Sequence, residues 1–136
     1  MQVISTDSPA DDLAAFLTSF TEGLAFGDDD LAAVVARHYP EGFEQYSDGR
    51  RFDRDDLAAH AAPLRKNLVS WRVDVQEALV SGRRLAARYT MHSTMRKGRE
   101  LEIEVYMFGE LDGEGRFRRI DQLTRTVAEQ NTPAGA

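Results

Sequence analysis

The hydrophobic pattern of this chain changes its period once, near Val69. Before that point, apolar residues recur every three or four positions, as they do along one face of a helix. The clearest run is Leu13, Phe16, Leu17, Phe20 and Leu24. After that point, apolar and polar residues alternate, which is the period of a half-buried strand. Helices followed by strands predict an α+β domain with its helices on one face of an antiparallel sheet.

Helix-breaking and capping residues divide the first half into three helices. Pro9 suits the first turn of a helix, and Gly27 ends the apolar stripe that follows it. The acidic run 28–30 favours the start of a second helix, because carboxylates are stabilised at the positive end of the helix dipole. Asp53 can cap a third helix, which Pro63 is expected to kink or split in two.

Short turn sequences divide the second half into strands. A hairpin is expected within residues 43–52, and tight turns are expected at 81–82, 97–98 and 112–115. These turns separate four alternating segments, of which the last covers residues 117–127. Four strands joined by tight turns form an antiparallel meander, and the three helices must cover one of its faces.

Length, charge and composition exclude several classes of protein. The 136 residues fit one domain, expected at 11–127 between a flexible N-terminus (1–10) and a disordered tail (128–136). The net charge of −6 disfavours a nucleic-acid partner. The sequence has no cysteine, no start typical of a signal peptide and no apolar stretch of bilayer length. We therefore expect a cytoplasmic protein that does not bind a membrane.

The sequence also lacks the short motifs that hold a cofactor or a metal. It contains no glycine-rich phosphate-binding loop and no nucleophile elbow of the G-x-S-x-G type. Its three histidines show none of the paired spacings typical of a metal site. We expect neither a cofactor nor a bound metal.

The alternation within the strands sorts their side chains onto two faces. An apolar face should meet the helices, and a polar face should carry cross-strand Arg–Glu pairs in solvent or in a dimer interface. The apolar face collects Trp71, Val73, Val75, Tyr89, Met91, Ile103, Val105, Met107, Ile120, Gln122 and Thr124. The polar face collects Arg72, Asp74, Arg88, His92, Glu102, Glu104, Tyr106, Asp121 and Arg125.

The order of these elements, with the strand LAARYTMHSTM (85–95) and the segment DGEGRFRRIDQLTR (112–125), resembles the nuclear-transport-factor-2-like (SnoaL-like) superfamily. The resemblance implies a cone-shaped half-barrel, in which three N-terminal helices pack on a curved four-strand meander with a short hairpin. It also implies a pocket at the open end and a homodimer through the outer face of the sheet. The superfamily includes isomerases, dehydratases, cyclases, epoxide hydrolases and non-enzymes, so the resemblance alone assigns no reaction.

Two reactions of the superfamily lack their residues in this sequence. Ketosteroid-isomerase-like members place a carboxylate base where this chain has Gln45, and a second acidic group near Met107. Limonene-epoxide-hydrolase-like members need an Arg-x-Asp pair on a central strand, and the third long strand has none. Scytalone-dehydratase-like and SnoaL-like members use His, Asp and Tyr side chains, which this chain does contain.

The first functional hypothesis is a small-molecule-binding domain of the SnoaL-like type with no assigned reaction. The inner face offers aromatic and thioether side chains with a few neutral polar groups, which suits a small apolar or aromatic molecule. The expected ligand-binding residues are Trp71, Tyr89, Met91, Met107, Gln122 and Thr124.

Two alternatives remain open. One is a cofactor-free lyase, isomerase or cyclase acting on a polyketide-like or ring-forming metabolite. In that case a bulge turns part of the polar face inward, His92 acts as general acid or base, Asp121 orients it, and Tyr46 assists. The other is a non-catalytic dimerisation module whose cone is filled by side chains. An ionisable group facing the cavity distinguishes the enzyme from the binding domain.

Overall fold

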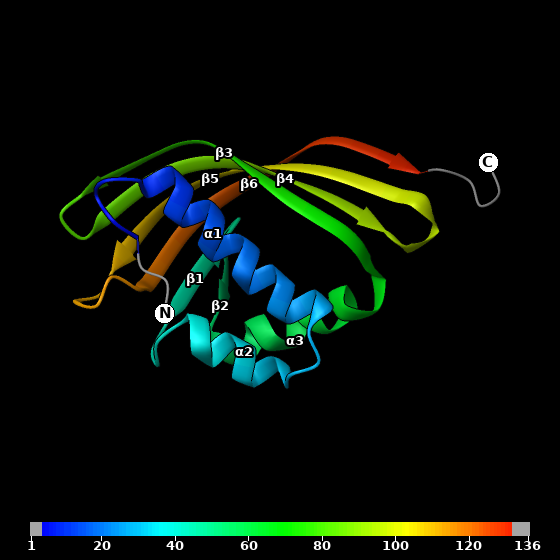
Figure 1. Ribbon diagram of the computed structural model, residues 1–136, viewed down its shortest axis with the longest axis horizontal. Coiled ribbons are helices and arrows are strands. Elements are labelled where there is room, and N and C mark those ends of the chain that lie inside the picture. Colours follow the sequence, from blue (N-terminus) through cyan, green and yellow to red (C-terminus); the bar gives the residue numbers. More distant parts are fainter. Residues whose placement is uncertain (1–3, 132–136) are drawn as a thin grey trace.

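The computed structural model describes residues 4–131 as one open sheet with three α-helices on one side of it (Figure 1). The helical segments are α1 (Pro9–Thr21), the π-helical turn η1 (Glu22–Phe26), α2 (Leu31–His38), α3 (Arg54–Asn67) and the short 3₁₀ turn η2 (Arg96–Gly98). The strands are β1 (Glu44–Ser47), β2 (Arg50–Phe52), β3 (Leu68–Ser81), β4 (Arg84–Met95), β5 (Arg99–Leu111) and β6 (Phe117–Asn131).

The six strands lie in the order β2-β1-β6-β5-β4-β3. The strands from β3 to β6 form the predicted antiparallel meander. The hairpin of β1 and β2 joins this meander through parallel pairing of β1 with β6. In Figure 1 the sheet arches over the helices. The predicted α+β class, with helices on a curved meander plus a short hairpin, is confirmed.

The folded part of the chain is longer at both ends than the expected range of 11–127. Ile4 is only 8% exposed and belongs to the hydrophobic core. At the other end, β6 continues to Asn131, because β5 begins at Arg99 and supplies backbone partners along that whole length.

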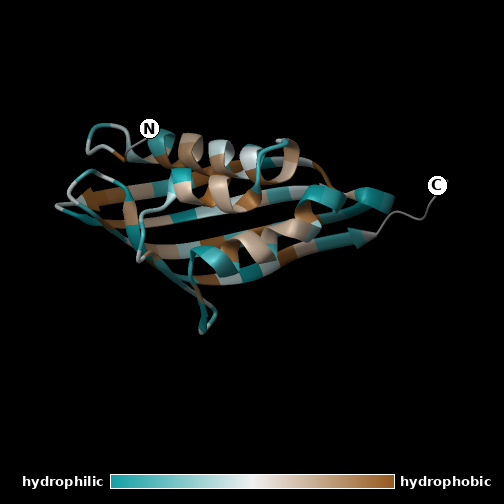
Figure 2. Cartoon of the chain, turned by 90° about the horizontal axis from the view of Figure 1, so that it is seen from below, coloured by the Kyte–Doolittle hydropathy of each residue, from teal (hydrophilic) through white to brown (hydrophobic). Residues whose placement is uncertain are grey.

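The strand register confirms the two predicted faces of the sheet. The face toward the helices is here called the inner face, and a set of residues paired across neighbouring strands is called a row. One row of the inner face consists of Val75, Tyr89, Val105 and Thr124. Val105 is fully buried, whereas the next residue, Tyr106, points to the opposite, outer face and is 47% exposed. Figure 2 shows the alternating hydrophobic and hydrophilic bands that this pattern gives to the strands.

The predicted starts of the second and third helices are also confirmed. The side chain of Asp30 accepts a hydrogen bond from the backbone N–H of Ala33 and so caps α2. Asp53 and Asp56 each accept a hydrogen bond from the other's backbone N–H, which forms a capping box at the start of α3. These caps satisfy N–H groups that have no partner within the helix.

The helix α3 continues through Pro63, so the predicted split at that proline is wrong. Two residues later, the Arg65 guanidinium ties the end of α3 to the segment around η1. It donates hydrogen bonds to the backbone carbonyls of Gly23 (3.0 Å), Leu24 (2.9 Å) and Asp29 (2.7 Å). These contacts hold the last turn of α3 in place beyond the proline.

Candidate functional site

The centre of the inner face is a wall of uncharged side chains. Three neighbouring rows form it, and they consist of Val73, Met91, Ile103 and Thr126; Val75, Tyr89, Val105 and Thr124; and Ala87, Met107 and Gln122. None of these side chains is charged at neutral pH. Tyr89 and Met107 are buried, and Met91 is half-buried against the same core. Such a wall can contact an apolar molecule but supplies no charged group.

Two of the predicted ligand-binding residues, Trp71 and Met91, lie toward the open end of the sheet. Both are half-buried. In Figure 1 the β4–β5 turn and the end of β6 extend past the helices, so the inner face is less covered there than at Tyr89. Trp71 also contributes to the lining of the groove that contains His92.

The predicted residues Gln122 and Thr124 are hydrogen-bonded to the turn between β1 and β2. The amide of Gln122 donates to Ser47 Oγ at 3.1 Å. Thr124 donates to the Asp48 carboxylate from its backbone N–H at 2.8 Å and from its hydroxyl at 2.5 Å. These bonds fix the hairpin against β6, and the Thr124 hydroxyl is not free to donate to a ligand.

Tyr39, which follows directly after α2, belongs to the same buried core as Tyr89 and Met107 of the wall. Its side chain is 3% exposed and lies within an aromatic cluster, with ring centroids 4.2 Å from Phe43, 5.0 Å from Phe20 and 5.5 Å from Phe16. Burial is the main cause that raises the pKa of the Tyr39 hydroxyl well above its usual value, and the nearby Tyr89 adds to it. Burial also raises the pKa of Tyr89. Both phenols are therefore uncharged at neutral pH.

Our sequence analysis did not select Tyr39, although a signal for it exists. The apolar face of α2 runs through Leu31, Val34, Val35 and His38. Tyr39 is eight residues after Leu31 and four after Val35, so it continues that face at ordinary helical spacing. The helix itself ends at His38, and Tyr39 is its C-cap residue with extended backbone angles.

His38 packs on the same aromatic cluster and is held as a neutral side chain. Its Nδ1 donates to the Val34 carbonyl at 2.8 Å, and its Nε2 accepts from the Ser19 hydroxyl at 3.2 Å. Burial, more than the charge of Arg37, lowers the pKa of His38 below its ordinary value, against the opposing effect of the bond to Val34.

We expect the free energy of unfolding to fall as the pH drops through about 6.5, the pKa of an unperturbed histidine. The unfolded chain takes up this proton first, since the pKa of His38 is lower in the folded state. Urea unfolding at a series of pH values between 8 and 5.5 measures the slope of the free energy of unfolding against pH. The variant His38→Gln should make this dependence on pH weaker. An unchanged slope in His38→Gln would contradict this account.

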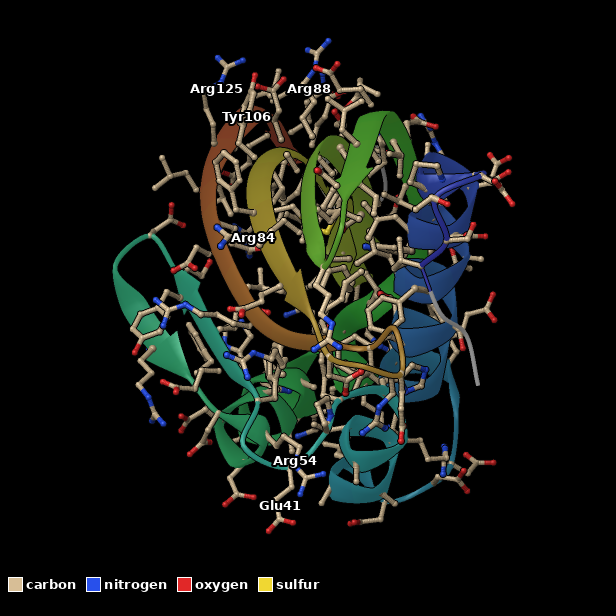
Figure 3. The ribbon with its side chains drawn as sticks, turned by 90° about the vertical axis from the view of Figure 1, so that its left-hand side faces the viewer. Glu41, Arg54, Arg84, Arg88, Tyr106 and Arg125 are labelled. Atoms are coloured by element: carbon tan, nitrogen blue, oxygen red, sulfur yellow. The ribbon has the colours of Figure 1, made fainter. Side chains whose placement is uncertain are left out.

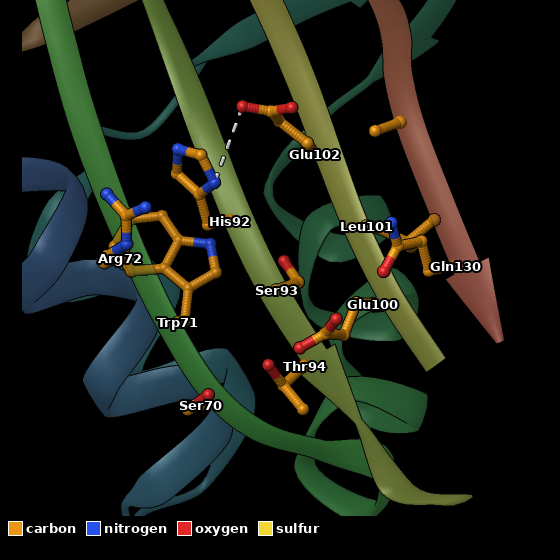
Figure 4. A pocket seen from close by; sticks show the side chains of 11 residues that line it. Ser70, Trp71, Arg72, His92, Ser93, Thr94, Glu100, Leu101, Glu102 and Gln130 are labelled. Atoms are coloured by element: carbon orange, nitrogen blue, oxygen red, sulfur yellow. Dashed lines mark ion pairs between the residues drawn. The ribbon is translucent and has the colours of Figure 1, made fainter. Parts of the chain in front are cut away.

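His92 lies on the outer face, not toward the helices. Its Nε2 is 3.1 Å from an Asp74 carboxylate oxygen, and its Nδ1 is 3.7 Å from Glu102 Oε1. Figure 4 shows His92 and Glu102 in a groove of about 430 Å³, with the helices behind the strands. The groove is open and lined by both signs of charge, with Arg72 on its other side.

Asp121 and Tyr46 lie on the outer face as well, and they are neighbours. They are paired in the register of β1 with β6. Arg119 joins them: its guanidinium is 2.9 Å from the Asp121 carboxylate and 4.6 Å from the centre of the Tyr46 ring. The Tyr46 hydroxyl donates to Glu44 at 3.0 Å. The hydrogen bond from Arg119, and then the charge of its guanidinium, lower the pKa of Asp121, which is therefore held as a carboxylate.

The structure does not bring His92 together with Asp121 and Tyr46. Asp121 of β6 and Ala86 of β4 pair with the same residue of β5, so they lie at the same level of the sheet. His92 is six residues further along β4, which corresponds to about 20 Å of strand. Asp121 cannot orient His92 over that distance, so the constellation suggested for the enzyme hypothesis does not form within one chain.

Within residues 4–131, no group of three or more His, Cys, Asp or Glu side chains is placed to hold a metal ion. In that same part of the chain, no helix is long and apolar enough to cross a membrane.

Comparisons with known proteins relate the chain to others by fold. No protein-family model matches the sequence, and no curated protein matches it. Solved structures do match. A conserved protein from Planctomyces limnophilus DSM 3776 aligns with a TM-score of 0.62 and 18% identity, over 87% of this chain and 98% of that one.

Two further matching structures are described as NTF2-like or SnoaL-like. An NTF2-like protein from Burkholderia pseudomallei K96243 aligns with a TM-score of 0.54 and 17% identity, over 79% of this chain and 86% of that one. A candidate SnoaL-like polyketide cyclase from Shewanella denitrificans OS-217 aligns with a TM-score of 0.63 and 10% identity, over 82% of this chain and 88% of that one. The chain therefore has the NTF2-like, SnoaL-like fold, as its sequence predicted.

Proposed function

We propose that this chain is a SnoaL-like small-molecule-binding domain that holds an apolar or aromatic molecule against the inner face of its sheet. One observation carries the proposal: the ionisable side chains suggested for catalysis lie on the outer face, whereas the three central inner rows are uncharged. Proton transfer needs an ionisable group beside the ligand, but binding needs only shape and a few neutral polar groups.

The ligand-binding residues of this proposal are Trp71, Met91, Tyr89 and Met107, in order from the open end of the sheet inward. Gln122 and Thr124 flank them and keep the β1–β2 hairpin in place. Their carbonyl and hydroxyl oxygens can still accept a hydrogen bond from a ligand. No cofactor takes part, and we place the domain in the cytoplasm, which its cysteine-free composition supports.

We also propose that the domain is a homodimer through its outer face. The outer patch consists of Leu79, Tyr106, Phe108 and Leu123, which are 68%, 47%, 64% and 66% exposed. Figure 3 shows Tyr106 with Arg84, Arg88 and Arg125 on the side of the sheet away from the helices. An exposed apolar cluster rimmed by charges is typical of a protein interface. A second copy would cover it with the same four side chains, as two-fold symmetry requires.

Calorimetric titration with cyclohexanone and acetophenone tests the binding proposal. The variant Met91→Trp places a bulky ring on the half-buried part of the wall, and we expect it to weaken binding at least about tenfold, which is about 1.4 kcal/mol. His92→Ala, one residue away on the outer face, should bind as the wild type does. Binding that survives Met91→Trp but is lost in His92→Ala would move the site to the outer groove and overturn the proposal.

A further inference from the structure

The groove around His92 is a concave site on the outer face, separate from the wall of the inner face. Its volume of about 430 Å³ falls within the range of small-molecule sites, roughly 300–1,000 Å³. Two neighbouring rows of the outer face supply most of its lining, and they consist of Arg72, His92, Glu102 and Ala128; and Ser70, Thr94, Glu100 and Gln130. All of these side chains except that of Ala128 are polar, so the groove favours a polar ligand.

The row that contains His92 is held in place by ionic contacts. The Asp74 carboxylate lies 2.5 Å from Arg72 Nη1 and 3.1 Å from His92 Nε2. On the other side of the imidazole, Nδ1 is 3.7 Å from Glu102 Oε1. Side chains fixed in this way lose less conformational freedom when a ligand binds, which favours binding.

The neighbouring row carries polar groups that those ionic contacts do not use. Ser70, Thr94, Glu100 and Gln130 pair across four adjacent strands, and Figure 4 shows Thr94 beside Glu100. The ion pairs around His92 involve none of these four side chains. Their hydroxyl, carboxylate and amide groups are therefore available to a ligand in the groove.

The two rows together place donors and acceptors side by side. Hydroxyl and amide side chains both donate and accept, carboxylates only accept, and the Arg72 guanidinium only donates. Neighbouring strands are about 4.8 Å apart and successive rows about 7 Å apart, so these groups form a grid. A molecule with several hydroxyls matches such a grid, because each hydroxyl can donate and accept. Trp71 and Leu101 also line the groove and add apolar contact.

We propose that this groove binds a neutral polyhydroxylated molecule, such as a sugar. An anion is disfavoured, because Glu100 and Glu102 lie two positions apart on the same face of β5. A compact cation could contact these two carboxylates, but it would leave Arg72 and the hydroxyl and amide groups without a partner. The site goes beyond the proposed function and does not depend on a ligand at the inner face.

The fluorescence of Trp71 tests the inference, because Trp71 is the only tryptophan of the chain and lines the groove. Three sugars of one ring size serve as probes: glucose, glucosamine, which carries an ammonium group, and glucuronate, which carries a carboxylate. We expect a saturable change of fluorescence with glucose, and binding of glucuronate at least about tenfold weaker. Glucosamine bound more than about tenfold tighter than glucose would identify a cation site and overturn the inference.

Three variants locate the binding of glucose. Glu100→Ala removes an exposed acceptor and should weaken it at least about tenfold, as expected for a hydrogen bond to a charged group. Thr94→Val keeps the shape of the side chain, removes its hydroxyl and should weaken glucose about fivefold. Glu114→Ala removes an exposed carboxylate in the turn between β5 and β6, and this matched control should leave the affinity unchanged.

Two results would overturn the inference: a wild type that shows no saturable response to glucose, or equal affinity in the wild type, Glu100→Ala and Thr94→Val. Calorimetric titration of Glu100→Ala with cyclohexanone separates this site from the inner face, since that affinity should equal that of the wild type. Loss of glucose binding with unchanged cyclohexanone binding supports two separate sites. Loss of both in Glu100→Ala would mean that there is one site, and the inference would fail.

Discussion

The variant Phe108→Asp should be a monomer at concentrations at which the wild type is a dimer. Phe108 stands in the middle of the outer patch and is 64% exposed in the single chain. Each dimer buries two copies of this ring, each worth about 1.5–3 kcal/mol, and the variant would bury two unpaired carboxylates instead. We expect the dissociation constant to rise by more than about 100-fold, measured by sedimentation equilibrium.

Phe26→Asp is the matched control, because Phe26 is also an exposed phenylalanine, 49% accessible, but belongs to η1 among the helices. This variant should dimerise as the wild type does. A wild type that sediments as a monomer at every concentration would contradict the proposed interface. A dimer that is lost in Phe26→Asp and kept in Phe108→Asp would place the interface on the helical side.

The largest loss of stability should come from Arg65→Met. The methionine keeps the aliphatic part of the side chain but removes three hydrogen bonds to the backbone carbonyls of Gly23, Leu24 and Asp29. Bonds of this kind, made by a charged donor, are worth about 1.5–3 kcal/mol each and are not additive. We expect the free energy of unfolding to fall by about 3 kcal/mol in urea titrations.

Lys66→Met provides the control for this experiment, since Lys66 is the next residue and its side chain is exposed. It should change the free energy of unfolding by less than about 0.5 kcal/mol. Arg65→Lys should fall between the two, because an ammonium group cannot reach three carbonyls in the fork geometry of a guanidinium. Equal stability of Arg65→Met and Lys66→Met would show that the contacts of Arg65 contribute nothing.

The two faces of the sheet could be predicted because the direction of a strand side chain depends only on local alternation. Tyr89 and His92 are three positions apart on β4, and this odd separation alone places them on opposite faces. The same reasoning assigned the buried Met107 and the exposed Tyr106 correctly. No knowledge of the other strands was needed for any of these residues.

The relation between His92 and Asp121 could not be predicted in the same way. Their separation depends on the register of β4, β5 and β6 together, and a bulge lies between Glu102 and Ile103. Alternation within each strand carries no information on register. Residues of one face can therefore lie at opposite ends of the sheet, as these two do.

The contacts of Gln122 and Thr124 depend on a pairing between distant parts of the chain. Gln122 bonds to a residue 75 positions away and Thr124 to one 76 positions away, because β1 lies parallel to β6. The sequence predicts a hairpin at 43–52 but contains no local signal for the strand that it joins. Tyr39 differs from this case, because the signal for it, its spacing from Leu31 and Val35, is local in the sequence.

Nuclear magnetic resonance of protein labelled with ¹³C at the methionine and leucine methyl groups tests most directly whether a small molecule binds the inner face. Met91 and Met107 report on the inner face, and Leu79 and Leu123 on the outer face. On titration with cyclohexanone, we expect saturable shifts of the Met91 and Met107 signals and none of the two leucine signals. Shifts confined to Leu79 and Leu123, or no shift at Met107, would contradict the binding site proposed for this protein.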